Sequence, residues 1–244
     1  NTTSGPAEGV NLLLFDPGEL DTEGQLRLTE RRLQHLVEVH RARAGDRLRV
    51  GEIGGLTGHG EILAIDRRSA TLAIELSEPP PPKLPLTLVL ALPRPKMLRR
   101  ILRAVAEFGV GELHLLHSYR VEKSYWQTPV LQEEAIHRYL LEGLQQSRDT
   151  VLPRISCHRR FKPYVEDLLP GLLQGKRALL AHPGDYPACP RGPAGETLVV
   201  IGPEGGFIPY EVEKLQQAGC QAVSLGPRIL RVENALTSLL GRLS

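Results

Sequence analysis

The sequence predicts an α/β protein in which a domain with a parallel sheet follows a small β-rich domain. Three observations support this prediction. From residue 84 onward, apolar strands alternate with amphipathic helices, which is typical of a parallel sheet with helices on both faces. Before residue 78, short segments of alternating polarity are separated by turn residues, which is typical of a small β-barrel or sandwich. Between the two lies the proline run Ser77-Glu-Pro-Pro-Pro-Pro-Lys83.

The first domain is predicted over residues 10–78. Residues 1–9 are polar and patternless, and we interpret them as a cloning remnant. The expected strands are Asn11–Phe15, Arg47–Val50, Glu61–Ile65 and Thr71–Leu76. One helix is expected at about Glu30–His40, with Leu33, Leu36 and Val37 facing inward.

Residues 79–83 form the predicted linker, because consecutive prolines cannot join a sheet ladder or a helix and favour a stiff, extended chain. The second domain is predicted over residues 84–244. Its expected strands are Leu86–Leu92, Leu113–His117, Arg154–Cys157, Ala178–His182, Leu198–Ile201 and Ala222–Leu225. Its expected helices are Lys96–Phe108, Glu133–Gln146, Tyr164–Gln174, Tyr210–Ala218 and the terminal segment Ala235–Leu243.

Cysteine spacing, the length of apolar runs and net charge exclude several classes of protein. The three cysteines are scattered and form no C-x-x-C pair, so neither a disulfide framework nor a zinc site is indicated, and we expect no metal. No apolar run approaches the roughly 20 residues of a membrane span, and no secretory leader is visible, so a cytoplasmic protein is expected. The net charge of +2 divides into −4 for residues 1–82 and +6 for the rest, a weak pointer to a polyanionic partner.

Two glycine-rich loops carry the strongest signal in the chain. They are Ile201-Gly-Pro-Glu-Gly-Gly-Phe207 and Leu225-Gly-Pro-Arg-Ile-Leu-Arg-Val-Glu-Asn-Ala235, and each follows a short apolar run. The helical segment Pro209–Gly219 between them predicts a strand–helix–strand crossover and therefore adjacent parallel strands. Both loops should then leave the carboxyl edge of the sheet, where open α/β sheets bind ligands.

Neither loop matches a phosphate-binding motif. The first has no Lys-Ser/Thr and no G-x-G-x-x-G spacing, and Glu204 would repel a phosphate. Bare backbone groups beside a carboxylate suit a neutral or cationic ligand. The alternative for either loop alone is a tight turn that uses glycine for its positive φ.

Together the loops resemble the signature of the RsmE-type 16S rRNA uridine N3-methyltransferases, members of the knotted SPOUT superfamily. In that family the second loop usually reads Ile-Leu-Arg-Thr-Glu-Thr-Ala, and this chain has Val232 and Asn234 in place of the two threonines. A family segment with a Glu and an Arg corresponds here to Gln145 and Asp149. The resemblance implies a SPOUT domain with a C-terminal trefoil knot, a PUA-like N-terminal RNA-binding barrel, S-adenosylmethionine as methyl donor, and N3 of U1498 as target.

The site predicted from these motifs has three parts. The donor is expected against Leu180, Ala181, His182, Pro183, Ile201, Gly202, Pro203, Glu204, Gly205, Gly206, Leu225, Gly226, Ile229, Leu230 and Arg231. Because uracil N3 must lose a proton, a base is needed, and Glu204, Glu233 or water could serve. Arg231 is the expected group that stabilises negative charge on the uracil oxygens, while Glu233 could equally favour the start of the helix that begins there.

RNA contacts are expected from a basic helix face and from scattered residues. The predicted RNA-binding residues are Arg27, His35, Lys96, Arg99, Arg100 and Arg228. A solvated basic face is the alternative for the helix. Tyr125 and Trp126 follow Arg120 and Lys123 and could stack bases, although a single Trp more often packs in a core. His114 and His117 are three apart on a predicted strand and should face opposite sides of the sheet, which argues against metal ligation by this pair.

The resemblance also implies a homodimer. Leu236, Leu239, Leu240 and Leu243 lie at helical spacing, and a symmetric interface or the interior of one chain could use that stripe. Two other functions compete with the leading one: ribose 2′-O-methylation, as in other SPOUT proteins, and a non-catalytic role in RNA binding and ribosome assembly. The second loop argues against the former, and Arg231 and Glu233 argue against the latter.

Overall fold

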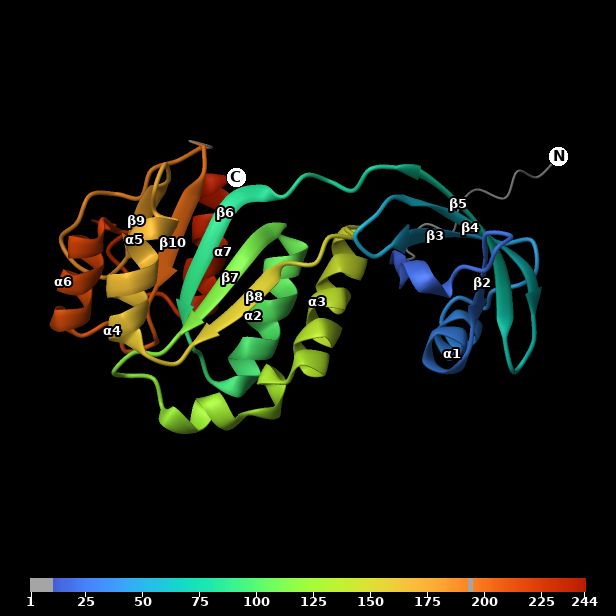
Figure 1. Ribbon diagram of the computed structural model, residues 1–244, viewed down its shortest axis with the longest axis horizontal. Coiled ribbons are helices and arrows are strands. Elements are labelled where there is room, and N and C mark those ends of the chain that lie inside the picture. Colours follow the sequence, from blue (N-terminus) through green and yellow to red (C-terminus); the bar gives the residue numbers. More distant parts are fainter. Residues whose placement is uncertain (1–10, 193–194) are drawn as a thin grey trace. The chain divides into compact units, whose positions relative to one another are not determined.

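The computed structural model describes residues 11–192 and 195–244 (Figure 1). Contacts divide the chain into two compact units, one formed by the residues up to Pro82 together with Leu141–Leu152, the other by Lys83–Leu140 and Pro153–Ser244. Residues 1–9, interpreted from the sequence as a cloning remnant, lie outside the described part. Within that part no helix has the length and apolar character needed to cross a membrane.

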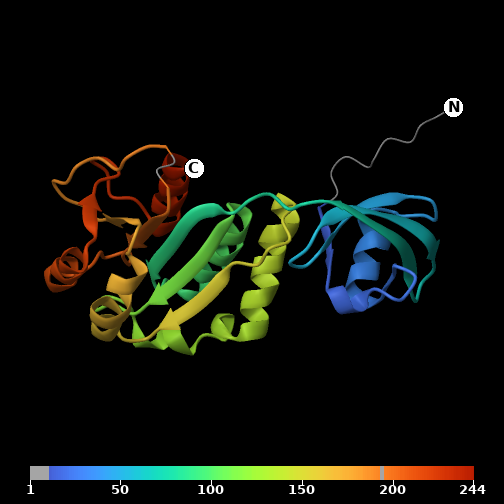
Figure 2. The same ribbon diagram turned by 45° about the horizontal axis from the view of Figure 1, so that its top comes forward.

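The first unit is a five-stranded sheet curved around a short helix (Figure 2). The strand order is β1 (Leu13–Phe15), β3 (Arg47–Glu52), β4 (Thr57–Ile65), β5 (Ala70–Glu78) and β2 (Gln25–Leu28). Only the β1–β3 pair is parallel, and the other pairs are antiparallel. A 3-10 turn, η1 (Pro17–Glu19), and the helix α1 (Glu30–Glu38) complete the unit before residue 82.

The core of this unit lies between the sheet and α1. Leu33 and Leu36 of α1 belong to the same buried cluster as Leu28 and Leu72 of the strands. Val37, expected to face inward, is instead exposed, because the cluster reaches only the face that carries Leu33 and Leu36. Strand β2 was not expected from the sequence.

The segment Leu141–Leu152 belongs to this unit although it lies far along the chain. The Gln145 carbonyl accepts a hydrogen bond from the Leu12 amide (3.2 Å), and the Thr150 carbonyl accepts one from the Gly54 amide (2.8 Å). The Asp149 carboxylate accepts hydrogen bonds from the Thr150 and Val151 amides and caps this turn. The Asp149 side chain, at a position that departs from the family pattern, therefore has a local structural role, whereas the contact of Gln145 is made by its backbone carbonyl.

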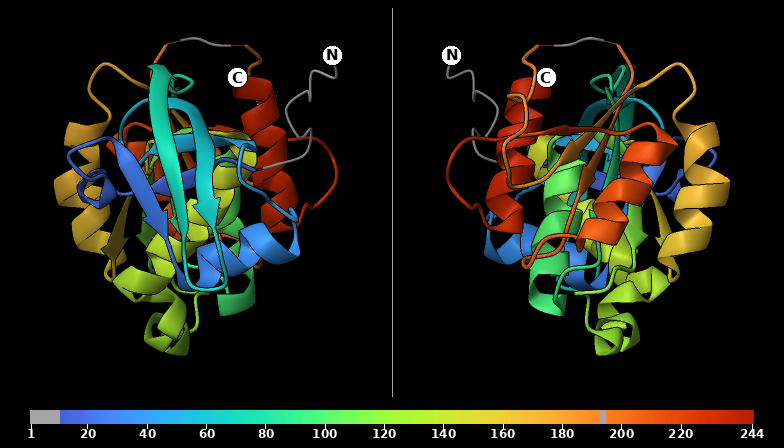
Figure 3. Two further views of the ribbon diagram at one scale, coloured as in Figure 1. Left: turned by 90° about the vertical axis from the view of Figure 1, so that its right-hand side faces the viewer. Right: turned by 90° about the vertical axis from the view of Figure 1, so that its left-hand side faces the viewer.

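The second unit is a six-stranded sheet in which all pairs are parallel. Its order is β11 (Gln221–Val223), β9 (Arg177–Ala181), β10 (Thr197–Ile201), β6 (Leu84–Ala91), β7 (Val110–Leu116) and β8 (Arg154–His158). The helices are α2 (Pro95–Glu107), α6 (Pro209–Ala218), α7 (Val232–Leu243) and the composite segment 161–172 described below. Helix α3 (Glu133–Ser147) begins in this unit and ends in the segment Leu141–Leu152, which belongs to the first unit. Two 3-10 turns, η2 (Lys123–Gln127) and η3 (Pro129–Leu131), follow β7. Figure 3 shows α7 and α2 on one face of the sheet and α6 with the composite segment on the other.

The helix expected at Tyr164–Gln174 is composite. It begins earlier, with α4 (Phe161–Pro163), continues as a π-helical turn, η4 (Tyr164–Leu168), and ends with α5 (Leu169–Leu172). The Leu169 amide bonds to the Tyr164 carbonyl, five residues back. Pro170 has no amide hydrogen to continue the α-helical ladder, which explains the widened turn before it.

The expected adjacency of the two loop-bearing strands is wrong. Strand β9 lies between β10 and β11, since Val199 of β10 and Gln221 of β11 both pair with Leu179 of β9. The crossover through α6 therefore passes over one strand, because both edges of β10 are already paired, with β9 and with β6. The two loops still leave the same carboxyl edge, since all three strands are parallel.

The apolar stripe of the terminal helix is buried inside the unit. Leu236, Leu239, Leu240 and Leu243 are each at most 7% exposed. Helix α7 packs on α2 and β10. The alternative that one chain buries this stripe internally is thus confirmed, and the stripe gives no support to a symmetric interface.

Candidate active site

A pocket opens at the carboxyl edge of β9, β10 and β11. Its lining residues are Ala181, His182, Pro183, Ile201, Gly202, Pro203, Glu204, Gly206, Ser224, Leu225, Gly226, Arg228, Ile229, Leu230, Val232 and Ala235. They come from the ends of the three strands and from the first turn of α7. Most of the residues predicted to hold a donor therefore meet in one place.

Two glycines of the lining have backbone conformations that other residues adopt at a cost. Gly206 has φ +78° and Gly226 has φ +124°. The Gly206 amide donates to the Pro203 carbonyl at 2.8 Å, which closes the first loop into a tight turn. The Gly226 amide donates to Ser224 Oγ at 3.1 Å, which holds the second loop. Both loops thus bring bare backbone to the pocket wall.

Three predicted donor contacts lie outside this lining. Leu180 is fully buried in β9, one residue before the pocket begins. Gly205 is exposed, and a Cβ added there would meet the Arg120 side chain at 3.0 Å rather than the pocket. Arg231 is exposed at the N-cap of α7, beside the lining residues Leu230 and Val232.

The predicted acid–base residues differ in their surroundings. Glu204 lines the pocket and is exposed to solvent. Glu233 is half-buried in the first turn of α7, where a carboxylate also favours the helix dipole. Of the two, Glu204 is the carboxylate placed to meet a ligand.

A guanidinium that the sequence did not assign to the site touches the first loop. Arg120 follows β7 and donates a hydrogen bond through Nη1 to the Gly205 carbonyl. Burial, and then the charge of Arg120, lowers the pKa of the pocket residue His182. Arg120 is therefore near enough to the pocket for its charge to act there. Because the two residues are 85 positions apart in the sequence, no local sequence motif could have predicted this contact.

Tyr125 lies near the same loop. Burial, then the charges of Glu122 and Glu204, raises the pKa of its phenol, while Arg94 acts in the opposite direction. Trp126 is instead buried, and its indole Nε1 donates to His117 Nδ1 at 3.0 Å. The interpretation of the single Trp as a packing residue fits this contact.

The two strand histidines have separate partners. His114 Nδ1 lies 2.7 Å from the Tyr164 hydroxyl, and its Nε2 lies 2.9 Å from a Glu112 oxygen. His117 accepts the indole hydrogen bond described above. Across residues 11–192 and 195–244, no group of three or more His, Cys, Asp and Glu side chains could hold a metal ion.

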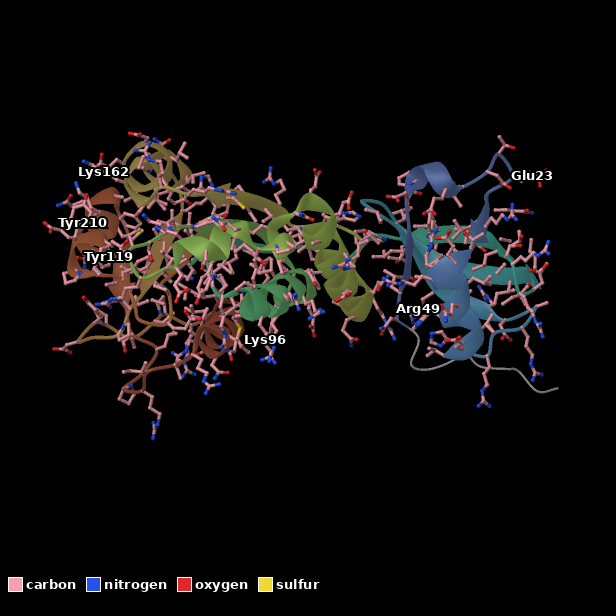
Figure 4. The ribbon with its side chains drawn as sticks, turned by 90° about the horizontal axis from the view of Figure 1, so that it is seen from below. Glu23, Arg49, Lys96, Tyr119, Lys162 and Tyr210 are labelled. Carbon is pink, nitrogen blue, oxygen red and sulfur yellow. The ribbon has the colours of Figure 1, made fainter. Side chains whose placement is uncertain are left out.

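The predicted RNA-binding residues are all exposed. Lys96, Arg99 and Arg100 share the free face of α2, whose opposite face buries Leu98, Ile101 and Leu102. Figure 4 shows Lys96 on this helix. Arg228 lines the pocket. In the first unit, Arg27 lies on β2 and His35 lies on α1, with its Nε2 3.2 Å from that of His40.

Comparisons with known proteins agree with this geometry. A family model described as an RNA methyltransferase domain matches residues 80–244, and one described as an RNA methyltransferase PUA domain matches residues 28–75. The chain is 30% identical over 233 residues to ribosomal RNA small subunit methyltransferase E of Treponema pallidum, covering 93% of this chain and 87% of that protein. It is 29% identical to the protein of the same name from Synechocystis, covering 91% and 73%.

Two solved structures share the fold. A probable rRNA-methyltransferase from Porphyromonas gingivalis superposes with a TM-score of 0.69 at 26% identity, covering 94% of each chain. A ribosomal RNA small subunit methyltransferase E from Neisseria gonorrhoeae, bound to S-adenosyl methionine, superposes with a TM-score of 0.71 at 21% identity, covering 93% of this chain and 94% of that one. The predicted SPOUT-type sheet domain and PUA-like domain are thereby confirmed, while the trefoil knot stays a prediction.

Proposed function

The chain belongs to the RNA methyltransferase family that includes ribosomal RNA small subunit methyltransferase E, and from this premise we propose that it methylates N3 of a uridine in 16S rRNA with S-adenosylmethionine as donor. By family resemblance the target is U1498. The observation that carries the proposal is the pocket in which the ends of β9, β10 and β11 converge. The relatives named above support both the rRNA substrate and the donor.

The residues of the pocket fit such a donor. Backbone at Gly206 and Gly226 allows close approach, and Ile229 and Leu230 offer exposed apolar surface. Glu204 provides a negative charge for a cationic ligand. When bound, S-adenosylmethionine supplies an electrophilic methyl group on a positively charged sulfur. We propose that residues 181–183, 201–204, 206 and 225–230 hold it, largely through backbone groups.

The chain's own residues then perform the proton and charge steps. The N3 proton of the uracil must leave as the N3 lone pair accepts the methyl group, and Glu204 is the carboxylate on the pocket wall that can take it. Negative charge that spreads onto O2 and O4 needs a cation, and we propose Arg231 for that role. Alignment within a closed site can supply about 7–11 kcal/mol of the barrier in favourable cases.

Two measurements test this function. Calorimetric titration with S-adenosylmethionine should show one saturable site per chain, and a protein that only binds RNA would show none. Mass spectrometry of small-subunit RNA from a deletion strain should show loss of one base methyl group, restored by the wild-type gene. A methyl group lost from a ribose instead would contradict the proposal and favour 2′-O-methylation.

Arg231→Ala gives a sharper test of the mechanism. Because the guanidinium should act mainly in the transition state, single-turnover methylation should fall by roughly 10²–10³-fold, the scale for losing one oxyanion donor. Donor affinity should change little, since the loop backbone remains. The exposed Arg191→Ala variant serves as a charge-matched control. A normal rate with both ligands saturating would make Arg231 a binding residue, and loss of donor binding would assign it a structural role.

We further propose how the rest of the molecule serves this reaction. The barrel of residues 10–78 would contact RNA through Arg27 and His35, the prolines of 79–83 would act as spacer, and residues 84–244 would carry the chemistry. The protein would work as a homodimer without a metal ion. Because its proposed substrate is ribosomal RNA, we propose that the protein acts in the cytoplasm.

A further inference from the structure

The segment that follows β7 is held firmly at several points. The Tyr119 amide donates to Glu211 Oε2 at 3.0 Å, and Glu211, in the first turn of α6, is itself only 3% exposed. The Val121 amide donates to the Ser118 carbonyl at 3.0 Å, and both residues are buried. Trp126 bonds back to His117. The backbone around Tyr119 and Arg120 is therefore fixed against α6 and β7.

Two tyrosine rings are nonetheless directed to solvent from this fixed backbone. Tyr119 is 77% exposed and Tyr210 is 45% exposed. Both adjoin the same carboxylate, because Tyr210 precedes Glu211 in the chain while the Tyr119 amide bonds to it. Figure 4 shows Tyr119 and Tyr210 at the same end of the second unit. Lys214 lies over the Tyr210 ring, with Nζ 5.7 Å from its centroid, and pairs with Glu166 at 3.1 Å.

Arg120 connects these rings to the pocket. It stands next to Tyr119 and bonds to the carbonyl of Gly205, within the loop that lines the pocket with Glu204 and Gly206. Tyr119 and Arg120 follow β7, and Tyr210 begins the helix that follows the first loop, so all three lie near the carboxyl edge of the sheet, beside the loop that lines the pocket. We call Tyr119, Arg120 and Tyr210 the tyrosine platform.

We propose that the tyrosine platform binds the single-stranded RNA that flanks the methylated nucleotide, with the two rings stacking on bases and Arg120 contacting the backbone. This inference rests on the proposed function. N3 of uracil forms a Watson–Crick hydrogen bond in a duplex, so the target and its neighbours must be unpaired when the methyl group is transferred. Unstacked bases are recognised by aromatic rings and guanidinium planes, which replace the lost stacking.

The test compares substitutions that remove or keep the rings. The variants are Tyr119→Ala/Tyr210→Ala, the conservative Tyr119→Phe/Tyr210→Phe, and the control Phe108→Ala. Phe108 is an exposed aromatic residue between α2 and β7, at the opposite, amino edge of the sheet. Binding is measured for a single-stranded RNA carrying the target sequence and for a duplex of the same sequence.

Affinity of the double alanine variant for the single strand should fall about fivefold or more for each ring removed. The phenylalanine variant and Phe108→Ala should bind like wild type, and donor affinity by calorimetry should stay unchanged in all three. In a second measurement, 5-iodouridine placed beside the target nucleotide should cross-link to Tyr119 or Tyr210 on irradiation. The KM for RNA should rise in the alanine variant while kcat changes less.

Several outcomes would overturn the inference. Unchanged single-strand affinity and KM in the alanine variant would do so, as would an equal loss in Phe108→Ala. A defect seen only on assembled small subunits would assign the surface to a ribosomal protein instead. The wild-type methylation assay separates this proposal from the function itself. If the wild type transfers no methyl group while the alanine variant still loses single-strand affinity, the platform stands and the proposed function fails.

Discussion

At the scale of single residues, the two neighbouring glycines of the first loop provide a matched pair. Gly206 lines the pocket at φ +78°, whereas Gly205 lies outside the lining and adjoins the flexible Arg120 side chain. Gly206→Val should strongly weaken S-adenosylmethionine binding, because it adds bulk to the pocket wall and strains a left-handed backbone by about 1–2 kcal/mol. Gly205→Val should weaken donor binding far less, since its Cβ meets Arg120. Calorimetric titration of both folded variants tests this, and equal affinities would contradict it.

His182 should make donor binding sensitive to pH. Burial, and then repulsion from Arg120, lowers its pKa below the ordinary value of 6.5. The folded pocket therefore favours neutral His182. This preference contributes to the free energy of folding, and the contribution is complete above pH 6.5 and is lost as the pH falls through the lowered pKa. Once protonated, His182 would repel a cationic donor. Affinity for S-adenosylmethionine should then be lower at about pH 5 than at about pH 7.5.

Two variants isolate the residue responsible. His182→Gln cannot gain a charge and should flatten the pH profile of donor affinity. Arg120→Gln removes the nearby positive charge and should move the midpoint toward higher pH. A profile that is unchanged in His182→Gln would assign the pH dependence to another group.

At the scale of an element, helix α2 has one apolar, buried face and one basic, exposed face. Its apolar residues are buried against the sheet and α7, and Arg103 lies over the Tyr139 ring at 4.9 Å. Arg99 and Arg100 remain exposed on the same helix. Arg99→Glu/Arg100→Glu should weaken RNA binding and reduce the slope of log affinity against log salt by roughly 1.5–2, because two phosphate contacts no longer release counterions.

A second double variant controls for net charge. Arg154→Glu/Arg191→Glu changes the charge by the same amount at two exposed residues that are not among the predicted RNA contacts. Its salt slope should stay closer to wild type than that of the α2 variant. Equal slopes for the two variants would show that α2 is only a solvated basic face.

At the scale of the whole molecule, sequence periodicity located most elements because their patterns are local. The alternating segments of the first unit and the apolar runs of the second appear where expected, within a few residues. Strand β2, with four residues, is too short to show a period. The position of β9 between β10 and β11 depends on which strand edge is free, and the attachment of residues 141–152 to the first unit depends on hydrogen bonds to distant chain. The contact of Arg120 with Gly205 is equally non-local, so no sequence motif predicts it.

The oligomeric state is also a property of the whole molecule, because it depends on which surfaces one chain leaves exposed. The leucine stripe of α7 is used inside one chain, so a homodimer would need another surface. Ile229 is 83% exposed at the rim of the pocket, next to the partly exposed Leu230. Such apolar side chains at a site rim suit either a bound donor or a partner subunit. We expect sedimentation of the wild type at micromolar concentration to give twice the 26.9 kDa of one chain.

Ile229→Glu distinguishes the two ways in which this rim could be covered. If a partner subunit covers Ile229, a buried carboxylate would be costly and the variant should sediment as a monomer with weakened activity. If only the donor covers it, donor affinity should fall while the mass stays that of a dimer. Val39→Glu, at an exposed apolar residue after α1, is the control and should change neither quantity. A monomeric wild type with full methylation activity would refute the dimer, and the site of one chain would then be complete without a partner.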